Sequence, residues 1–67
     1  MSFNTIKTEE RDGIYIITLN RPKAKNAMNS EMWQELCWAF DHLDETDSLR
    51  CCIMTNVGDC FCAGSDL

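Results

Sequence analysis

The first nineteen residues show the alternation and the turn signal of a β-hairpin. Residues 3–9 alternate with one modestly apolar face, which is typical of a strand at the edge of a sheet. Asp12-Gly13 is the strongest short signal for a hairpin turn. The run from Ile14 to Leu19 is apolar on both faces, so we expect a strand inside a sheet that is covered on both sides.

A helical pattern follows a loop that begins at Asn20-Arg21-Pro22. Asn29 or Ser30 is expected to cap this helix, which runs to about Asp44. Its apolar side chains share one broad stripe, which indicates an amphipathic helix lying on a sheet: Met32, Trp33, Leu36, Cys37, Ala39, Phe40 and Leu43.

Two aromatic side chains fall outside this stripe. Trp38 lies on the polar side, where it is either a lone apolar surface residue or the contact for another segment or subunit. His42 lies on a flank of the polar face, and we expect it to be solvated and without a functional role.

The run from Cys51 to Thr55 has the length of a strand and is apolar throughout, which favours a buried parallel strand. Strand, helix and strand in this order predict a βαβ unit with a right-handed crossover. Asn56 to Asp59 then turn the chain at the carboxyl end of the strand, where sites in open α/β sheets are found. Sixty-seven residues make at most one small domain, and a parallel strand with no strand beyond it leaves an unpaired edge, so we expect a single partial α/β domain, residues 1–67.

The composition narrows the possible partners. A net charge of -5 argues against nucleic acid and anionic membranes, because the field repels phosphates. The sequence contains no run of eighteen apolar residues, and its first seven residues lack the apolar centre of a signal peptide. We therefore expect a soluble, cytoplasmic protein that binds neither nucleic acid nor membrane.

The five cysteines do not have the spacing of a disulfide framework or a zinc site, since they occur as Cys-Cys and Cys-x-Cys and their number is odd. We expect reduced thiols packed in the core, and no bound metal.

Two stretches are candidates for chemistry. Gly64 lies where a positive φ would let the chain turn, and the N–H of Ser65 would then point outward beside Asp66, which can cap a following helix. Such an amide is suited to an oxyanion hole, although an ordinary tight turn is the alternative. The basic loop of Arg21, Lys23 and Lys25 is either a site for an anionic ligand or a solvated loop.

The order and spacing of two motifs resemble the enoyl-CoA hydratase/isomerase (crotonase) superfamily. These motifs are Asn20-Arg21-Pro22-Lys23-Ala24-Lys25-Asn26-Ala27-Met28 and, beyond a helix and an apolar strand, Phe61-Cys62-Ala63-Gly64-Ser65-Asp66-Leu67. The resemblance runs from about Gly13 to the last residue and is to the amino-terminal part of the family. It implies a spiral of ββα units that assembles as a trimer or hexamer and acts on acyl-CoA thioesters.

The resemblance also implies roles for individual residues. The backbone amide of Ser65, after Gly64, would be one of two donors to the thioester oxygen as an enolate forms. Coenzyme A would enter as part of the substrate, with no separately bound cofactor. Its binding residues would be Ala24, Lys25, Ala27, Ala63, Asp66 and Leu67.

Other parts of the family's active site lie downstream of the segment that these 67 residues resemble. These are the second amide donor and the acid/base glutamates of the hydratases. The chain's own glutamates are expected to be solvated surface: Glu9, Glu10, Glu31, Glu35 and Glu45. We therefore expect the front part of a longer enzyme, a hydratase or an isomerase; a non-catalytic truncated remnant is the alternative.

Overall fold

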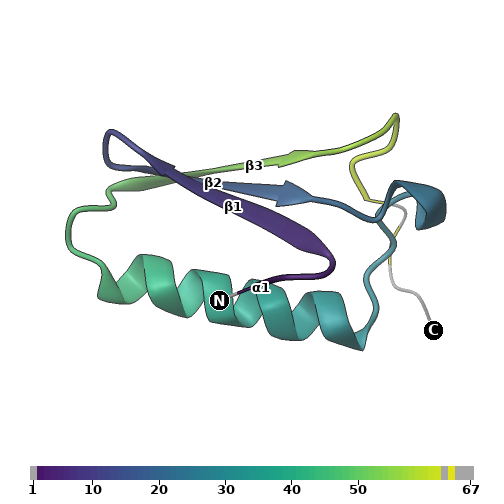
Figure 1. Ribbon diagram of the computed structural model, residues 1–67, viewed down its shortest axis with the longest axis horizontal. Coiled ribbons are helices and arrows are strands. Elements are labelled where there is room, and N and C mark those ends of the chain that lie inside the picture. Colours follow the sequence, from purple (N-terminus) through teal and green to yellow (C-terminus); the bar gives the residue numbers. More distant parts are fainter. Residues whose placement is uncertain (1, 63, 65–67) are drawn as a thin grey trace.

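The computed structural model describes residues 2–62 and 64, which form a three-stranded sheet with one helix across one face (Figure 1). The sheet order is β1-β2-β3. The elements are β1 (Ile6–Arg11), β2 (Ile14–Leu19), a 3-10 helix η1 (Pro22–Ala24), α1 (Ser30–Glu45) and β3 (Cys51–Asn56).

The predicted hairpin is confirmed. Strands β1 and β2 are antiparallel, and Asp12 and Gly13 turn between them with φ of 51° and 82°. Two successive positive φ angles are those of a type I′ turn, whose twist matches that of the strands. The first strand begins at Ile6 rather than Phe3, because the backbone N–H groups of Asn4 and Thr5 donate to the carboxylate of Glu35 on α1.

Strands β2 and β3 are parallel, with Leu19 opposite Asn56 at the carboxyl ends. The sequence correctly predicts this pairing, but the prediction that β3 is buried is wrong. Ile53 is 49% exposed and Met54 39% exposed, because β3 is the outer strand and, among the described residues, nothing packs beyond it.

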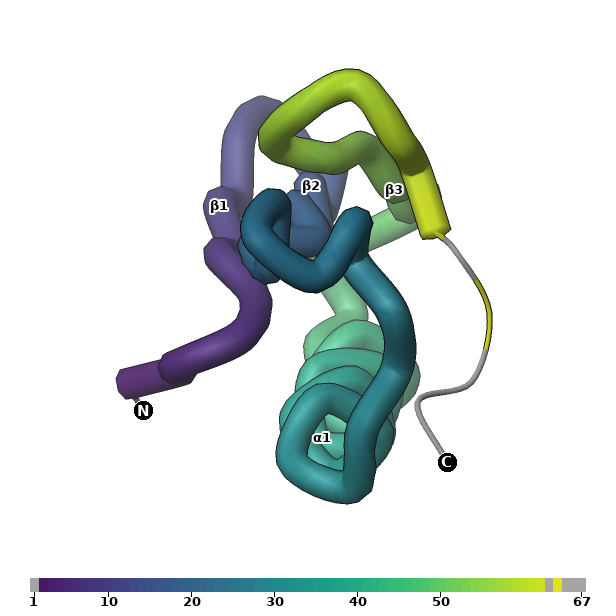
Figure 2. Tube along the Cα trace, turned by 90° about the vertical axis from the view of Figure 1, so that its right-hand side faces the viewer, coloured from purple at the N-terminus to yellow at the C-terminus, as the bar shows by residue number. Residues whose placement is uncertain are grey.

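The helix covers one face of the sheet (Figure 2). Tyr15, Ile17 and Leu19 of β2 are buried on that face, whereas Ile14 and Ile16 on the other face are half-buried. The expectation that β2 is covered on both sides is therefore not met within the described part of the chain.

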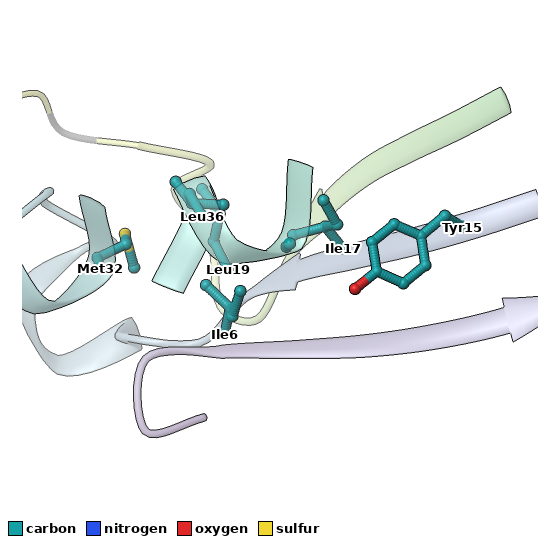
Figure 3. Packing of buried hydrophobic residues seen from close by; sticks show 7 residues of the cluster. Ile6, Tyr15, Ile17, Leu19, Met32 and Leu36 are labelled. Atoms are coloured by element: carbon teal, nitrogen blue, oxygen red, sulfur yellow. The ribbon is translucent and has the colours of Figure 1, made fainter. Parts of the chain in front are cut away.

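The core lies between α1 and the β1–β2 hairpin (Figure 3). It consists of Ile6, Tyr15, Ile17, Leu19, Met32, Leu36 and Ala39. The helix bounds agree with the prediction to within one residue, and the side chain of Asn29 caps the helix by accepting from Met32 N at 2.9 Å. Trp33, Cys37 and Phe40, predicted to lie on the buried stripe, are exposed, because the apolar stripe is wider than the surface that the hairpin covers.

Side chains on the polar flank of α1 make more contacts with the rest of the chain than the sequence predicts. Trp38 meets Phe3 edge-on at 5.4 Å and stacks on His42 at the same distance, so it contacts the segment before β1. His42 is not simply solvated, since its Nε2 lies 3.1 Å from a carboxylate oxygen of Glu10. Glu35 is also not a solvated residue, because it is half-buried and accepts from Asn4 and Thr5.

The expectation of core thiols is met only in part, since Cys52 and Cys62 pack against the core cluster. All five cysteines are free, but none is buried: Cys37 and Cys51 are exposed, and Cys52, Cys60 and Cys62 are half-buried. They lie on the helix flank and on the outer strand and its exit, which the hairpin does not cover.

Candidate functional site

Two loops leave the same edge of the sheet. Loop 20–28 follows β2, and segment 57–64 follows β3, with Val57 N donating to Leu19 O at 2.8 Å at the strand ends. Figure 1 shows η1 beside the turn after β3. Because β2 and β3 are parallel, both connections begin at their carboxyl ends, the edge at which sites of α/β sheets form.

Loop 20–28 is held by its own backbone. Ala24 N and Asn26 N donate to Arg21 O at 3.0 and 2.8 Å, and Lys25 N donates to Pro22 O at 3.1 Å. Lys25 and Asn26 adopt φ of 52° and 56°, in the left-handed region that few residues other than glycine enter. The loop is therefore a closed turn of defined shape.

Asn26 joins this loop to segment 57–64. Its side chain is buried; Oδ1 accepts from Arg21 N at 2.6 Å, and Nδ2 donates to Val57 O at 3.0 Å and Cys60 O at 2.7 Å. Reasoning from the sequence missed this role. The available signal was the residue type, since asparagine tolerates the left-handed conformation and offers both a donor and an acceptor.

A second link joins the far ends of the two loops. Met28 N donates to Gly64 O at 2.8 Å. Gly64 adopts φ of 108°, the positive value expected of it, and a Cβ at Gly64 would have no atom within 4 Å. The predicted site residues Ala63, Ser65, Asp66 and Leu67 lie outside the described residues.

A cleft of about 410 Å³ lies between the two loops. It is lined by Pro22, Lys25, Val57, Gly58, Asp59 and Cys60. Lys25 is thus the predicted coenzyme A-binding residue that the structure places on the cleft.

The other two predicted binding residues of the loop are engaged within it. Ala27 N donates to Ala24 O at 3.0 Å, and Ala27 O accepts from the guanidinium of Arg21. Ala24 lines a separate hollow of about 260 Å³ with Arg21 and Lys23. The structure therefore brings Lys25 and Gly64 to the two neighbouring loops but does not place Ala24 and Ala27 on the cleft.

Among the described residues, three groups have shifted pKa values, and none of them lines the cleft. Burial raises the pKa of Tyr15 in the core, and burial followed by the neighbouring Cys51 raises the pKa of Cys52 on β3. Burial alone would raise the pKa of Glu35, but hydrogen bonds from Asn4 and Thr5 outweigh it, so this pKa lies below its ordinary value. The described cleft is lined by one basic and one acidic side chain, Lys25 and Asp59, together with backbone groups.

Two further features concern only residues 2–62 and 64. In this part of the chain, no three His, Cys, Asp or Glu side chains gather in a way that could hold a metal ion. None of its helices has the length and apolar character needed to span a membrane.

Comparisons with known proteins bear on this arrangement. The family described as Enoyl-CoA hydratase/isomerase matches residues 9–67. The chain is 46% identical over 59 residues to enoyl-CoA hydratase EchA19 of Mycobacterium tuberculosis, an alignment covering 88% of this chain and 22% of that protein. It is 40% identical over 55 residues to 1,2-epoxyphenylacetyl-CoA isomerase of Escherichia coli, covering 82% of this chain and 21% of that protein.

The same likeness is found in three dimensions. A crystal structure of an enoyl-CoA hydratase/isomerase from Mycobacterium paratuberculosis matches with a TM-score of 0.96 and 39% identity, covering 98% of this chain and 26% of that one. The chain thus spans about a quarter of the length of these relatives and has the amino-terminal part of the crotonase fold. By sequence and by fold, this chain belongs to the enoyl-CoA hydratase/isomerase family.

Proposed function

We propose that this chain supplies one oxyanion donor and part of the coenzyme A-binding loop of an acyl-CoA-processing enzyme of the enoyl-CoA hydratase/isomerase type. The donor is the backbone amide of Ser65, which would hold the thioester oxygen as an enolate forms. Family membership supports this class of substrate, as do relatives named enoyl-CoA hydratase and 1,2-epoxyphenylacetyl-CoA isomerase. Coenzyme A is then part of the substrate.

The observation that carries the proposal is the bond from Met28 N to Gly64 O. The N–H and C=O of a planar trans peptide point in opposite directions. The proposal requires the Ser65 N–H to face away from loop 20–28, toward a substrate. A Gly64 carbonyl that accepts from Met28 N fits this requirement. Preorganised donors of this kind are worth about 3 kcal/mol each, or roughly a hundredfold in rate.

The positive charge of loop 20–28 supports the proposal that it binds the anionic phosphates of the ligand. Arg21, Lys23 and Lys25 are three of the six basic residues in a chain whose net charge is -5. Lys25 lines the cleft between the two loops, where a phosphate of coenzyme A would gain from a nearby ammonium group. We propose Ala24, Ala27, Ala63, Asp66 and Leu67 as further contacts of the same ligand.

A second candidate, a non-catalytic segment, is favoured by the positions of three glutamates. Glu9 pairs with Arg11, Glu10 lies against His42, and Glu35 accepts from Thr5. These side chains belong to β1 and α1, and none of them lines the cleft. They are therefore committed elsewhere rather than poised as a general acid or base.

A chimera tests the proposed function. Residues 1–67 replace the matching segment of the Mycobacterium paratuberculosis relative, and turnover of crotonyl-CoA is compared with that of the unaltered relative. We expect turnover in the chimera, a loss of roughly a hundredfold or more in kcat with Ser65→Pro, and near-normal rates with Ser65→Ala. Proline removes the amide, whereas alanine keeps it.

Two outcomes would decide against parts of the proposal. Normal turnover by the Ser65→Pro chimera would show that this amide is not the donor. Turnover of crotonyl-CoA by the isolated 67-residue chain would rule out the non-catalytic candidate. Assembly as a trimer or hexamer and a cytoplasmic location stay predictions; light scattering of the chimera measures the first.

A further inference from the structure

We infer that Asn26 is a positioning residue that holds loop 20–28 against segment 57–64 and so sets the width of the cleft in which Lys25 lies. The inference deepens the proposed function, on which it depends for its ligand, the phosphates of coenzyme A. The link itself depends only on the described contacts of Asn26.

The side-chain amide of Asn26 spans both loops. It has two N–H donors and one carbonyl acceptor. Nδ2 donates to Val57 O at 3.0 Å and to Cys60 O at 2.7 Å, while Oδ1 accepts from Arg21 N at 2.6 Å. Because the residue is fully buried, water cannot easily replace any of these partners. A shift of one loop relative to the other would break both Nδ2 bonds.

The backbone of Asn26 adds a second requirement. Its φ of 56° follows a Lys25 φ of 52°, so two consecutive non-glycine residues are left-handed. Asparagine and aspartate adopt this conformation more readily than most other non-glycine residues, because their short polar side chains can form local hydrogen bonds. Glycine would keep the backbone shape without the link, and aspartate would keep the acceptor without the donors.

The hydrogen bonds of Asn26 lie next to the cleft that we propose as the ligand site. The bond from Val57 to Leu19 lies at the strand ends, and the bond from Met28 to Gly64 lies at the far end of both loops. Asn26 stands between these bonds in sequence and holds the carbonyls of Val57 and Cys60, two residues that line the cleft together with Lys25. Loss of the link should therefore move Lys25 relative to the opposite wall.

The experiment uses the full 67-residue chain with coenzyme A as the probe, titrated by calorimetry. Asn26→Gly and Asn26→Asp are each expected to weaken binding at least tenfold with the stoichiometry unchanged. Reversible unfolding alone would also weaken the apparent affinity, in proportion to the folded fraction, so each variant is titrated where circular dichroism shows it to be more than half folded and a tenfold loss cannot come from unfolding. Amide hydrogen exchange should show at least tenfold less protection at Met28 in both variants and little change at Ile17 in β2.

Asn56→Ala is the matched control. Asn56 Nδ2 donates to Gly58 O at 2.8 Å and Cys60 O at 3.2 Å, so it orders the same turn without reaching loop 20–28. We expect this variant to stay within threefold of the wild-type affinity. An equal loss in Asn56→Ala would overturn the inference, because internal order of the turn would then be what matters.

Other outcomes separate the inference from the proposed function. If neither the wild-type chain nor the chimera binds coenzyme A, the proposed ligand is wrong, and exchange at Met28 still tests the link. If Asn26→Gly unfolds, Asn26→Asp carries the test. Wild-type protection at Met28 in a folded Asn26 variant would overturn the role of Asn26.

Discussion

A Cβ atom on Gly58 would stand only 3.1 Å from the Cβ of Pro22, so the turn after β3 packs directly against the start of η1. Gly58 also has φ of 92°. Gly58→Ala therefore adds backbone strain and an overlap with Pro22, and we expect it to lower the free energy of unfolding by about 2 kcal/mol in urea denaturation.

Gly64→Ala is the comparison for this prediction. Gly64 has φ of 108°, but a Cβ there would meet no atom within 4 Å, so this variant carries the strain without the overlap. A cost of about 1 kcal/mol is expected. Equal costs for the two variants would mean that the approach of Gly58 to Pro22 is not a tight contact.

Alternate residues of β2 should differ sharply in their contribution to stability. Ile17 is fully buried beneath α1, whereas Ile16 faces the other side and is half-buried. Ile17→Ala should cost about 3 kcal/mol, and Ile16→Ala about 1 kcal/mol or less, in thermal unfolding followed by circular dichroism. A larger cost at Ile16 would indicate that the second face is covered in solution.

Glu35 should make stability depend on pH. Its carboxylate accepts from Asn4 N at 3.0 Å, Thr5 N at 2.9 Å and Thr5 Oγ1 at 2.8 Å. Burial raises the pKa of Glu35, but these bonds lower it by more than burial raises it. The folded pKa therefore lies below the ordinary value of 4.5. The unfolded chain then binds the proton more readily, and acid favours unfolding. This contribution is complete above pH 4.5 and is lost as the pH falls through the folded pKa.

The substitution Glu35→Gln measures this contribution. It should lower the free energy of unfolding by about 1–2 kcal/mol at neutral pH, and the difference from wild type should shrink in acid. Glu9→Gln is the control, since its pair with Arg11 is exposed and should contribute less than about 0.5 kcal/mol. A difference at Glu35 that is constant from neutral to acid pH would contradict the charged hydrogen bonds.

Elements set by neighbouring residues could be predicted from the sequence. The Asp12-Gly13 turn places both residues at positive φ, and the Asn29 side chain caps the helix that follows it. These are short-range effects of backbone preference and side-chain hydrogen bonding, so a single sequence contains them. The same is true of the positive φ at Gly64.

Long-range contacts could not be predicted in this way. Glu35 reaches Thr5 across 30 positions, and Asn26 reaches Cys60 across 34. Both residues have ordinary polar side chains in the sequence, and most of their partners are backbone groups that any residue would offer. The apolar pattern of β3 predicts more burial than the structure shows for a related reason, because an apolar strand does not specify which neighbours are there to cover it.

Lys25 provides the most direct test of the basic loop as a ligand site. It lines the cleft with Asp59, so Lys25→Glu places two acidic side chains where an ammonium and a carboxylate stood. The affinity for coenzyme A should fall about tenfold at low salt, because reversing a charge near a phosphate changes the interaction by more than 1 kcal/mol. The effect should diminish at high salt as the charges are screened.

Lys23→Glu is the control, because it alters a basic residue of the same loop that does not line the cleft. The logarithm of its loss in affinity for coenzyme A should be at most about half of that for Lys25→Glu. Equal losses would favour a diffuse field of the loop over a contact at Lys25, and unchanged affinity in both variants would remove the basic loop from the binding site.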